Sequence, residues 1–158
     1  MKAPVGWDHS GLYHVGFFVD DVPSAIARMG AGSDLRWTAV QEHVMVLWRP
    51  GFPPEPITAT GAYTLGGPVH LELTQIRSGP LHPPTDELVP HHLGYWCDDV
   101  MATTDELVAA GWTVEFMGGV PGQDPTISVV RAPNGYCVEL VPSSSRDRIE
   151  AKLEVRRS

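Results

Sequence analysis

The stretch LYHVGFFVDDV, residues 12–22, returns later in the chain as PHHLGYWCDDV, residues 90–100. When the two copies are aligned, His14 falls on His92 and both phrases end in Asp-Asp-Val. Each copy has the alternation of a β-strand and then leads into a helix-like segment after an aspartate. The repetition predicts two similar halves, each opening with a strand and a helix. The other matched pairs are Gly16 with Gly94, Phe17 with Tyr95 and Phe18 with Trp96.

Each half continues with three runs that favour β-strands. Asp21 and Asp99 are well placed to cap the two helices, because a carboxylate can accept the free N–H groups of a first helical turn. Asn134-Gly135, between the last two runs, is a strong hairpin signal. Both halves therefore predict the order βαβββ. The runs are residues 36–48, 57–65 and 69–75 in the first half, and 112–119, 126–132 and 136–142 in the second.

The predicted fold is an α+β domain in which two tandem βαβββ modules form a cupped mixed sheet, followed by a short C-terminal helix. We assign residues 1–79 to the first module, 91–142 to the second and 143–158 to a helical tail, all within one structural domain. A Pro-rich linker, residues 80–90, joins the modules. A second Pro-rich stretch, residues 49–56, is not expected to continue a central ladder and is a candidate cap over a pocket.

Composition excludes several classes of protein. The chain has 158 residues, 42% of them hydrophobic, and a net charge of −8 without a basic stripe, so nucleic acid is not an expected partner. The N-terminal sequence has no signal-peptide core and no apolar run long enough to span a bilayer, which predicts a soluble cytoplasmic protein that does not bind membranes. Cys97 and Cys137 lie in predicted strands and are expected to be free thiols. Neither has a CxxC partner, which excludes a thiolate zinc site.

Two histidines and two glutamates recur at matching positions of the halves. Strand alternation turns His14 and His92 away from the apolar faces that pack on the helices. Glu72 and Glu139 lie in the apolar runs HLELTQ and CVELVP, where an unpaired carboxylate is costly to bury. Paired halves would supply two nitrogen and two oxygen ligands, a set that suits a divalent metal. The alternative is structural histidines and solvated glutamates, but recurrence of all four favours the metal site.

The same alternation predicts the surroundings of this site. Leu12 and Phe18 share the strand face of His14, and Trp96 shares that of His92. Phe18 and Trp96 therefore predict apolar walls and a substrate with a sizeable hydrophobic portion, the alternative being plain core packing.

Two further histidines lie next to the candidate ligands. His70 precedes Glu72 by two residues and shares its face, so it is either a pocket residue that supports the ligands or a histidine at a sheet edge. His91 should point to the face opposite His92, and we interpret it as structural, with an exchange of ligand role with His92 as the alternative.

Paired βαβββ modules with these His and Glu positions resemble the vicinal oxygen chelate superfamily. That superfamily includes glyoxalase I, methylmalonyl-CoA epimerase, extradiol dioxygenases and bleomycin- or fosfomycin-resistance proteins. The resemblance covers residues 12–142 and implies that His14, Glu72, His92 and Glu139 bind one divalent ion, with Zn, Ni, Co, Mn and Fe all open. It also leaves a homodimer open, because modules in this superfamily often pair between chains.

The resemblance implies a metal-dependent lyase, isomerase or epimerase that activates an enolisable carbonyl compound through an enolate. By similarity to glyoxalase I, Glu139 is the first candidate for the base that takes the proton and Glu72 the second, with a different residue as the alternative. An Fe(II) extradiol-type dioxygenase and a metal-free drug-binding protein are the competing functions. The epimerases have Gln at the position of Glu72, which argues against a coenzyme A substrate here.

Overall fold

The computed structural model describes residues 8–79 and 88–154, and both modules have the predicted order of elements. Most of the expected linker and the ends of the chain lie outside these ranges. The first module contains β1 (Leu12–Phe18), α1 (Val22–Gly30), β2 (Gln41–Trp48), β3 (Glu55–Tyr63) and β4 (His70–Ser78). The second contains β5 (His92–Cys97), α2 (Val100–Ala109), β6 (Thr113–Gly118), β7 (Ile127–Arg131) and β8 (Cys137–Pro142).

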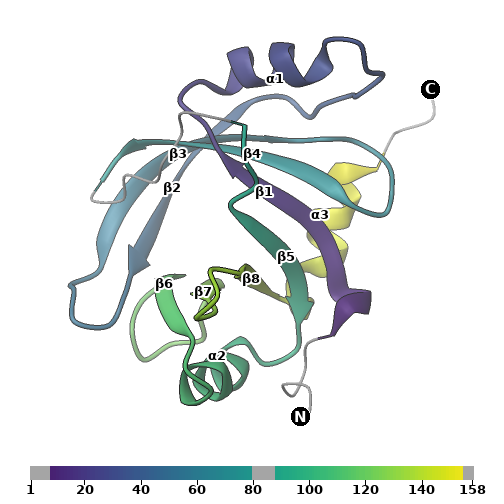
Figure 1. Cartoon of the computed structure of the whole chain (residues 1–158). Helices are drawn as coiled ribbons and strands as arrows, with labels where there is room; N and C mark the ends of the chain where they lie inside the picture. Colours follow the sequence, from purple (N-terminus) through teal and green to yellow (C-terminus); the bar gives the residue numbers. More distant parts are fainter. Residues whose placement is uncertain (1–7, 80–87, 155–158) are drawn as a thin grey trace.

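The eight strands form one sheet that curves into a closed barrel, in the order β1-β4-β3-β2-β6-β7-β8-β5. The first strand of each module runs parallel to the last, as β1 with β4 and β5 with β8. The modules meet at two antiparallel seams, β1 with β5 and β2 with β6. The cupped mixed sheet expected from the sequence is therefore confirmed, and the β2–β6 seam closes it (Figure 1).

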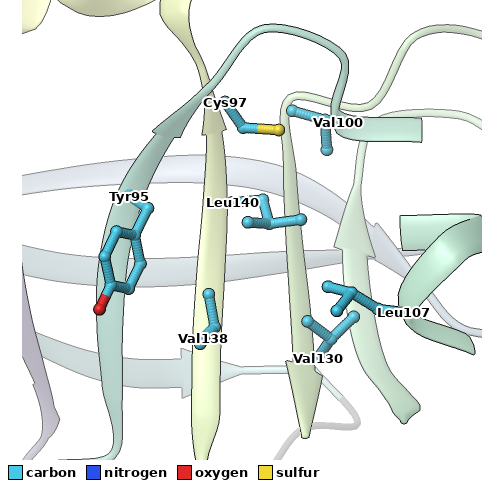
Figure 2. Packing of buried hydrophobic residues seen from close by; sticks show 7 residues of the cluster. All are labelled: Tyr95, Cys97, Val100, Leu107, Val130, Val138 and Leu140. Carbon is cyan, nitrogen blue, oxygen red and sulfur yellow. The ribbon is translucent and has the colours of Figure 1, made fainter. Parts of the chain in front are cut away.

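The two helices of the modules lie on opposite outer sides of the barrel (Figure 1). Both begin at the predicted caps: the Asp21 carboxylate accepts a hydrogen bond from the Ser24 N–H at 2.8 Å, and the Asp99 carboxylate one from the Ala102 N–H at 2.9 Å. Figure 2 shows the apolar cluster between α2 and its half of the sheet. This α2 cluster consists of Tyr95, Cys97, Val100, Leu107, Val130, Val138 and Leu140.

Besides the α2 cluster, three apolar clusters pack the helices and strands of the barrel together. The α1 cluster places Val22 and Ala25 on Phe17, Val19 and Leu73. A second cluster joins strands of both modules: Phe18, Leu47, Ile57, Phe116, Val129 and Cys137. The third cluster is Tyr13, Trp96 and Val141, against which Ile149 of α3 packs.

Several predicted boundaries are shifted. β2 begins at Gln41, and Trp37 forms an isolated bridge to Thr64 instead of extending the strand. Pro56 does join the ladder, opposite Val46, because it pairs with β2 before β3 gains its second neighbour, β4, at Thr58.

The tail starts with a 3₁₀ turn, Ser143–Ser145, followed by α3 (Arg146–Leu153). A further 3₁₀ turn, His9–Gly11, precedes β1. In the described part of the chain, no helix is long and apolar enough to cross a membrane. Cys97 and Cys137 are buried free thiols, as predicted.

Candidate metal centre

The four predicted ligand residues come together on four neighbouring strands. His14 lies on β1, Glu72 on β4, His92 on β5 and Glu139 on β8. The His14 Nε2 atom lies 2.9 Å from Glu139 Oε2 and 3.1 Å from His92 Nε2. His92 Nε2 lies 3.5 Å from Glu139 Oε2, and the Glu72 carboxylate is 3.6 Å from His14 Nε2 and 4.0 Å from His92 Nε2. One potential ligand atom from each residue thus falls in a group with no separation above 4.8 Å.

The glycine in each copy of the repeat makes room for the histidine of the other copy. His14 is paired with Gly94 across the β1–β5 seam, and Gly16 is paired with His92. A Cβ atom at Gly94 would lie 1.9 Å from His14 Cε1, and one at Gly16 would lie 2.1 Å from His92 Nε2. Each imidazole therefore lies over the backbone of the opposite strand.

Because the site is buried, the pKa of His92 and the pKa of Glu139 each depend on the charge of the other residue. Burial alone lowers the pKa of His92, but the charge and hydrogen bond of Glu139, followed by the charge of Glu72, outweigh it and raise that pKa. Burial likewise raises the pKa of Glu139, but the attraction of His92 and the hydrogen bonds from His14 and His92 hold it well below its usual range. Glu139 therefore stays ionised in the barrel wall.

The Glu72 carboxylate is held by two hydroxyl groups that were not among the predicted site residues. The Tyr63 hydroxyl donates to Oε2 and the Thr74 hydroxyl donates to Oε1 at 3.0 Å. Tyr63 lies opposite Glu72 in the β3–β4 ladder, whereas the matching neighbour of Glu139 is Val129. The two halves of the site thus differ in their support. Thr74 matches Val141 in the repeat, so that part of the difference is visible in the sequence, whereas the place of Tyr63 depends on the β3–β4 register.

The donor set and its spacing fit one divalent ion. Neighbouring ligand atoms about 2.1 Å from a tetrahedral or octahedral ion lie about 3.0–3.4 Å apart. The two imidazole Nε2 atoms lie 2.9–4.0 Å from each other and from the nearest oxygens of the two carboxylates. Two imidazole nitrogens 3.1 Å apart can both present a lone pair only to a shared cation. Two imidazoles and two carboxylates suit a borderline divalent metal.

A β-bulge changes the predicted face of β1 at its start. Leu12 pairs with Tyr95 and His14 with Gly94, so Tyr13 is an extra residue in the ladder. Leu12 consequently packs against the α2 cluster, and its predicted place on the face of His14 is wrong. The Tyr13 ring instead meets the His14 ring edge-on, with centroids 4.4 Å apart. Alternation within one strand could not show this, because a bulge depends on the register with the partner strand.

A cavity of about 530 Å³ is lined by Tyr13, whose ring contacts His14, but by none of the four candidate ligands. Tyr13 and Trp96 form one wall as a stacked pair, with ring centroids 3.8 Å apart. Burial, then the charge of Glu139 and then that of Glu72, raise the pKa of Tyr13 well above its ordinary value, so its phenol stays protonated. The Trp96 indole N–H is buried without a hydrogen-bond partner among the described residues. The rest of the lining includes Ser10, Pro68, His70, Arg146, Glu150 and Glu154.

The three predicted pocket residues have different positions. Trp96 and His70 both line the cavity. His70 is not at a sheet edge, since β4 pairs with β1 and β3, and its Nδ1 bonds the Thr64 carbonyl at 2.8 Å. Phe18 packs in the apolar cluster shared by the two modules, with its ring centroid 6.1 Å from that of His92.

Strand alternation predicted that His91 points away from the centre, but its ring contacts that of His92. His91 precedes the first residue of β5, so strand alternation does not govern it, and its ring lies edge-on to Phe18 at 4.6 Å. Its Nδ1 atom lies 3.0 Å from Nδ1 of His92. The side chain thus contacts the back of a candidate ligand.

Comparison with known proteins places the chain in a family that matches this fold. Residues 13–130 match the family model of the Glyoxalase/Bleomycin resistance protein/Dioxygenase superfamily, and the chain belongs to that superfamily. No curated protein matches it.

Among solved structures, methylmalonyl-CoA epimerase from Mycobacterium tuberculosis is 16% identical, with a TM-score of 0.53 over 94% of this chain and 96% of that one. A variant of the Streptomyces coelicolor methylmalonyl-CoA epimerase, in complex with 2-nitronate-propionyl-CoA, is 13% identical, with a TM-score of 0.50 over 85% of this chain and 97% of that one. At these identities the likeness shows the fold.

Proposed function

We propose that this protein is a metal-dependent lyase, isomerase or epimerase that removes a proton next to a substrate carbonyl group. The observation that carries the proposal is the buried group of His14, Glu72, His92 and Glu139, whose atoms have the spacing of ligands around one ion. A divalent ion held there supplies a Lewis acid that polarises the carbonyl and stabilises the enolate.

Glu139 is the proposed general base, with Glu72 the second candidate. Two hydroxyl groups fix both oxygens of the Glu72 carboxylate, whereas Glu139 contacts the two histidines. An ion bound there would add its own positive charge beside Glu139, which would keep the carboxylate ionised and able to accept a proton. A carboxylate oxygen of Glu139 can then take the proton from the substrate carbon and return it.

We assign the cavity to the part of the substrate away from the reacting carbon, because Tyr13 connects its lining to His14 and no candidate ligand lines it. Tyr13 and Trp96 offer flat aromatic surface, and Ser10 and His70 add polar groups to the lining. Arg146 is paired with Glu150 at 2.9 Å, and Glu154 adds a second carboxylate to the lining. This balance of charge does not favour the phosphates of a coenzyme A ester, so we expect a smaller carbonyl compound.

Elemental analysis of protein purified without chelator tests the metal. We expect about one divalent ion per chain in the wild type and in His43→Ala, whose side chain is exposed on β2. We expect loss of the ion in His92→Ala and His14→Ala. Full occupancy in His92→Ala, or a metal-free wild type that cannot be loaded, would rule the proposal out.

Exchange of substrate C–H protons for deuterium, screened over enolisable carbonyl compounds, tests the reaction. We expect metal-loaded Glu139→Gln to lose exchange while keeping most of its ion, because the amide oxygen remains a weak ligand. Oxygen uptake with catechols on iron-loaded protein, without any proton exchange, would point to ring cleavage instead.

A further inference from the structure

A chain of polar contacts leads outward from the back of His92. The Nε2 atom of His92 faces the other three candidate ligands, and its Nδ1 atom lies 3.0 Å from Nδ1 of His91. The His91 Nε2 atom lies 3.2 Å from Glu115 Oε2 on β6. The other carboxylate oxygen of Glu115 accepts a hydrogen bond from Nε of Arg131 on β7. This series of polar contacts thus runs from β5 to two more strands of the second module.

The groups at the two ends of this series of contacts fix the direction in which its hydrogen bonds donate. If His92 is a ligand through Nε2, that atom carries a lone pair and its proton is on Nδ1. His91 must then accept at Nδ1, which leaves its own proton on Nε2, where the Glu115 carboxylate accepts it. Arg131 donates to the same carboxylate. In this order each of the imidazole hydrogens has an acceptor, and the lone pair of His92 Nε2 faces the centre. The 3.4 Å approach of the Arg131 guanidinium to His91 Nε2 is then a contact and not a hydrogen bond.

Packing holds the His91 ring in this position. Its backbone N–H donates to the Gly16 carbonyl at 2.8 Å, which ties the residue to β1. The Phe18 ring packs edge-on against the imidazole, whose side chain is 15% exposed. The ring therefore has little freedom to turn away from His92.

The two candidate histidine ligands differ in this respect. The Nδ1 atom of His14 is buried without a hydrogen-bond partner among the described residues. Its ring is located by the backbone of Gly94 and by Tyr13. His92 is therefore the ligand whose tautomer is set by a hydrogen bond.

The same outer group does not make a second cation site. Cys137 Sγ lies 4.0 Å from Glu115 Oε2, so three potential ligands are near one another. However, the Arg131 guanidinium already neutralises Glu115 and approaches His91 Nε2 within 3.4 Å. A metal ion there would meet a fixed positive charge, whereas a hydrogen-bonded support for His92 needs that arrangement.

We infer that His91 and Glu115 are positioning residues that fix His92 in the tautomer and orientation required to bind the metal ion. The inference rests on the proposed function, since it takes His92 as a metal ligand. Supporting hydrogen bonds of this kind typically change metal affinity by about 10–100-fold. Here the support passes through a second histidine before it reaches the carboxylate.

The test is the dissociation constant for Zn²⁺, measured by competition with a chelating dye, together with the absorption spectrum of the Co²⁺-loaded protein. His91→Phe removes the acceptor, and we expect binding about 10–100-fold weaker and an altered Co²⁺ spectrum. His91→Asn places an acceptor oxygen near the position of Nδ1 and should recover most of the affinity. Glu115→Gln, nearly isosteric, should weaken binding by a smaller factor.

His43→Phe and Glu42→Gln are the matched controls, because both residues are exposed on β2 and Glu42 also faces an arginine, Arg77, at 3.8 Å. Both should bind Zn²⁺ as the wild type does. If His91→Phe and Glu115→Gln bind within twofold of the wild type while His92→Ala loses the ion, the positioning role is wrong and the metal centre stands. If the wild type binds no ion, both proposals fail.

Discussion

Two glycines allow the histidines of the repeat to approach each other. Gly94→Ala puts a methyl group at a point 1.9 Å from His14 Cε1, so the ring must leave its place or the β1–β5 seam must widen. We expect a loss of about 1–3 kcal/mol in the free energy of unfolding, and metal binding weakened by at least about 100-fold. Urea unfolding and a Zn²⁺ titration measure the two effects.

The matched control is Gly30→Ala at the end of α1, where an added Cβ would have no heavy atom within 4 Å. That substitution should leave metal binding unchanged and stability equal or slightly higher. Wild-type metal affinity in Gly94→Ala would show that the histidines do not need this close approach.

Glu115 makes a contribution to stability that depends on pH. Burial raises its pKa, but hydrogen bonds from His91 and Arg131 outweigh burial and lower the pKa from 4.5 to about 2. Because the folded pKa lies below the unfolded one, the stabilisation is present above pH 4.5 and is lost as the pH falls towards 2. Allowing for screening at the partly exposed Arg131, it amounts to roughly 1–2 kcal/mol.

The free energy of unfolding of Glu115→Gln, compared with the wild type across this range, tests that sign. The difference should be largest near neutral pH and should narrow between pH 4.5 and 2. The other carboxylates titrate in both proteins, so their contributions to the free energy of unfolding cancel in the difference. A difference that stays constant over the range, or one that widens, would contradict the assigned ion pair.

Residue identities predicted the centre better than its surroundings. His14, Glu72, His92 and Glu139 were found because the chain repeats them, and a repeat is visible without a structure. Residues that support them occur once. Thr74 lies two residues after Glu72 on β4, so alternation along the strand could have found it. Tyr63 and Glu115 lie on other strands, and one strand's sequence carries no information about which residue lies opposite.

At the scale of elements, the start of each helix follows from local chemistry. The carboxylates of Asp21 and Asp99 cap α1 and α2, and both caps were predicted because they depend on the three or four residues that follow. The bulge at Tyr13 was not predicted, since it depends on a register set by β5. Local signals such as helix caps can therefore be predicted from the sequence, whereas the pairing between distant strands cannot.

Removing a cap should cost a modest and equal amount in each module. We expect Asp21→Ala and Asp99→Ala each to lower the free energy of unfolding by about 1 kcal/mol, because one N–H of the first turn loses its acceptor. Metal binding should change little, since the caps lie outside the centre. Urea unfolding of Asp98→Ala, the exposed neighbour in the same motif, provides the comparison and should match the wild type more closely. An equal loss of unfolding free energy in Asp98→Ala and Asp99→Ala would show that Asp99 does not stabilise α2 as a cap.

At the scale of the whole molecule, the centre connects the two modules. Each module supplies one histidine and one glutamate, and the four strands that carry them are adjacent in the barrel. The second seam, β2 with β6, contains the pairs Leu47 with Gly118 and Trp48 with Met117. Closure by this seam was not foreseen, because it brings together strands that belong to different copies of the repeat.

Metal binding should therefore stabilise both modules together. An ion bound by residues of both halves favours the folded state alone, and at a free concentration 100 times its dissociation constant it adds about 2.7 kcal/mol. Thermal unfolding with Zn²⁺ should shift upward in a single transition, and chelator should reverse the shift. Hydrogen exchange should slow in α1 and α2 alike, although the helices lie on opposite sides of the barrel. His92→Ala should show no shift, whereas His43→Ala should follow the wild type. Protection confined to one helix, or an equal shift in His92→Ala, would mean that the ion does not join the two halves.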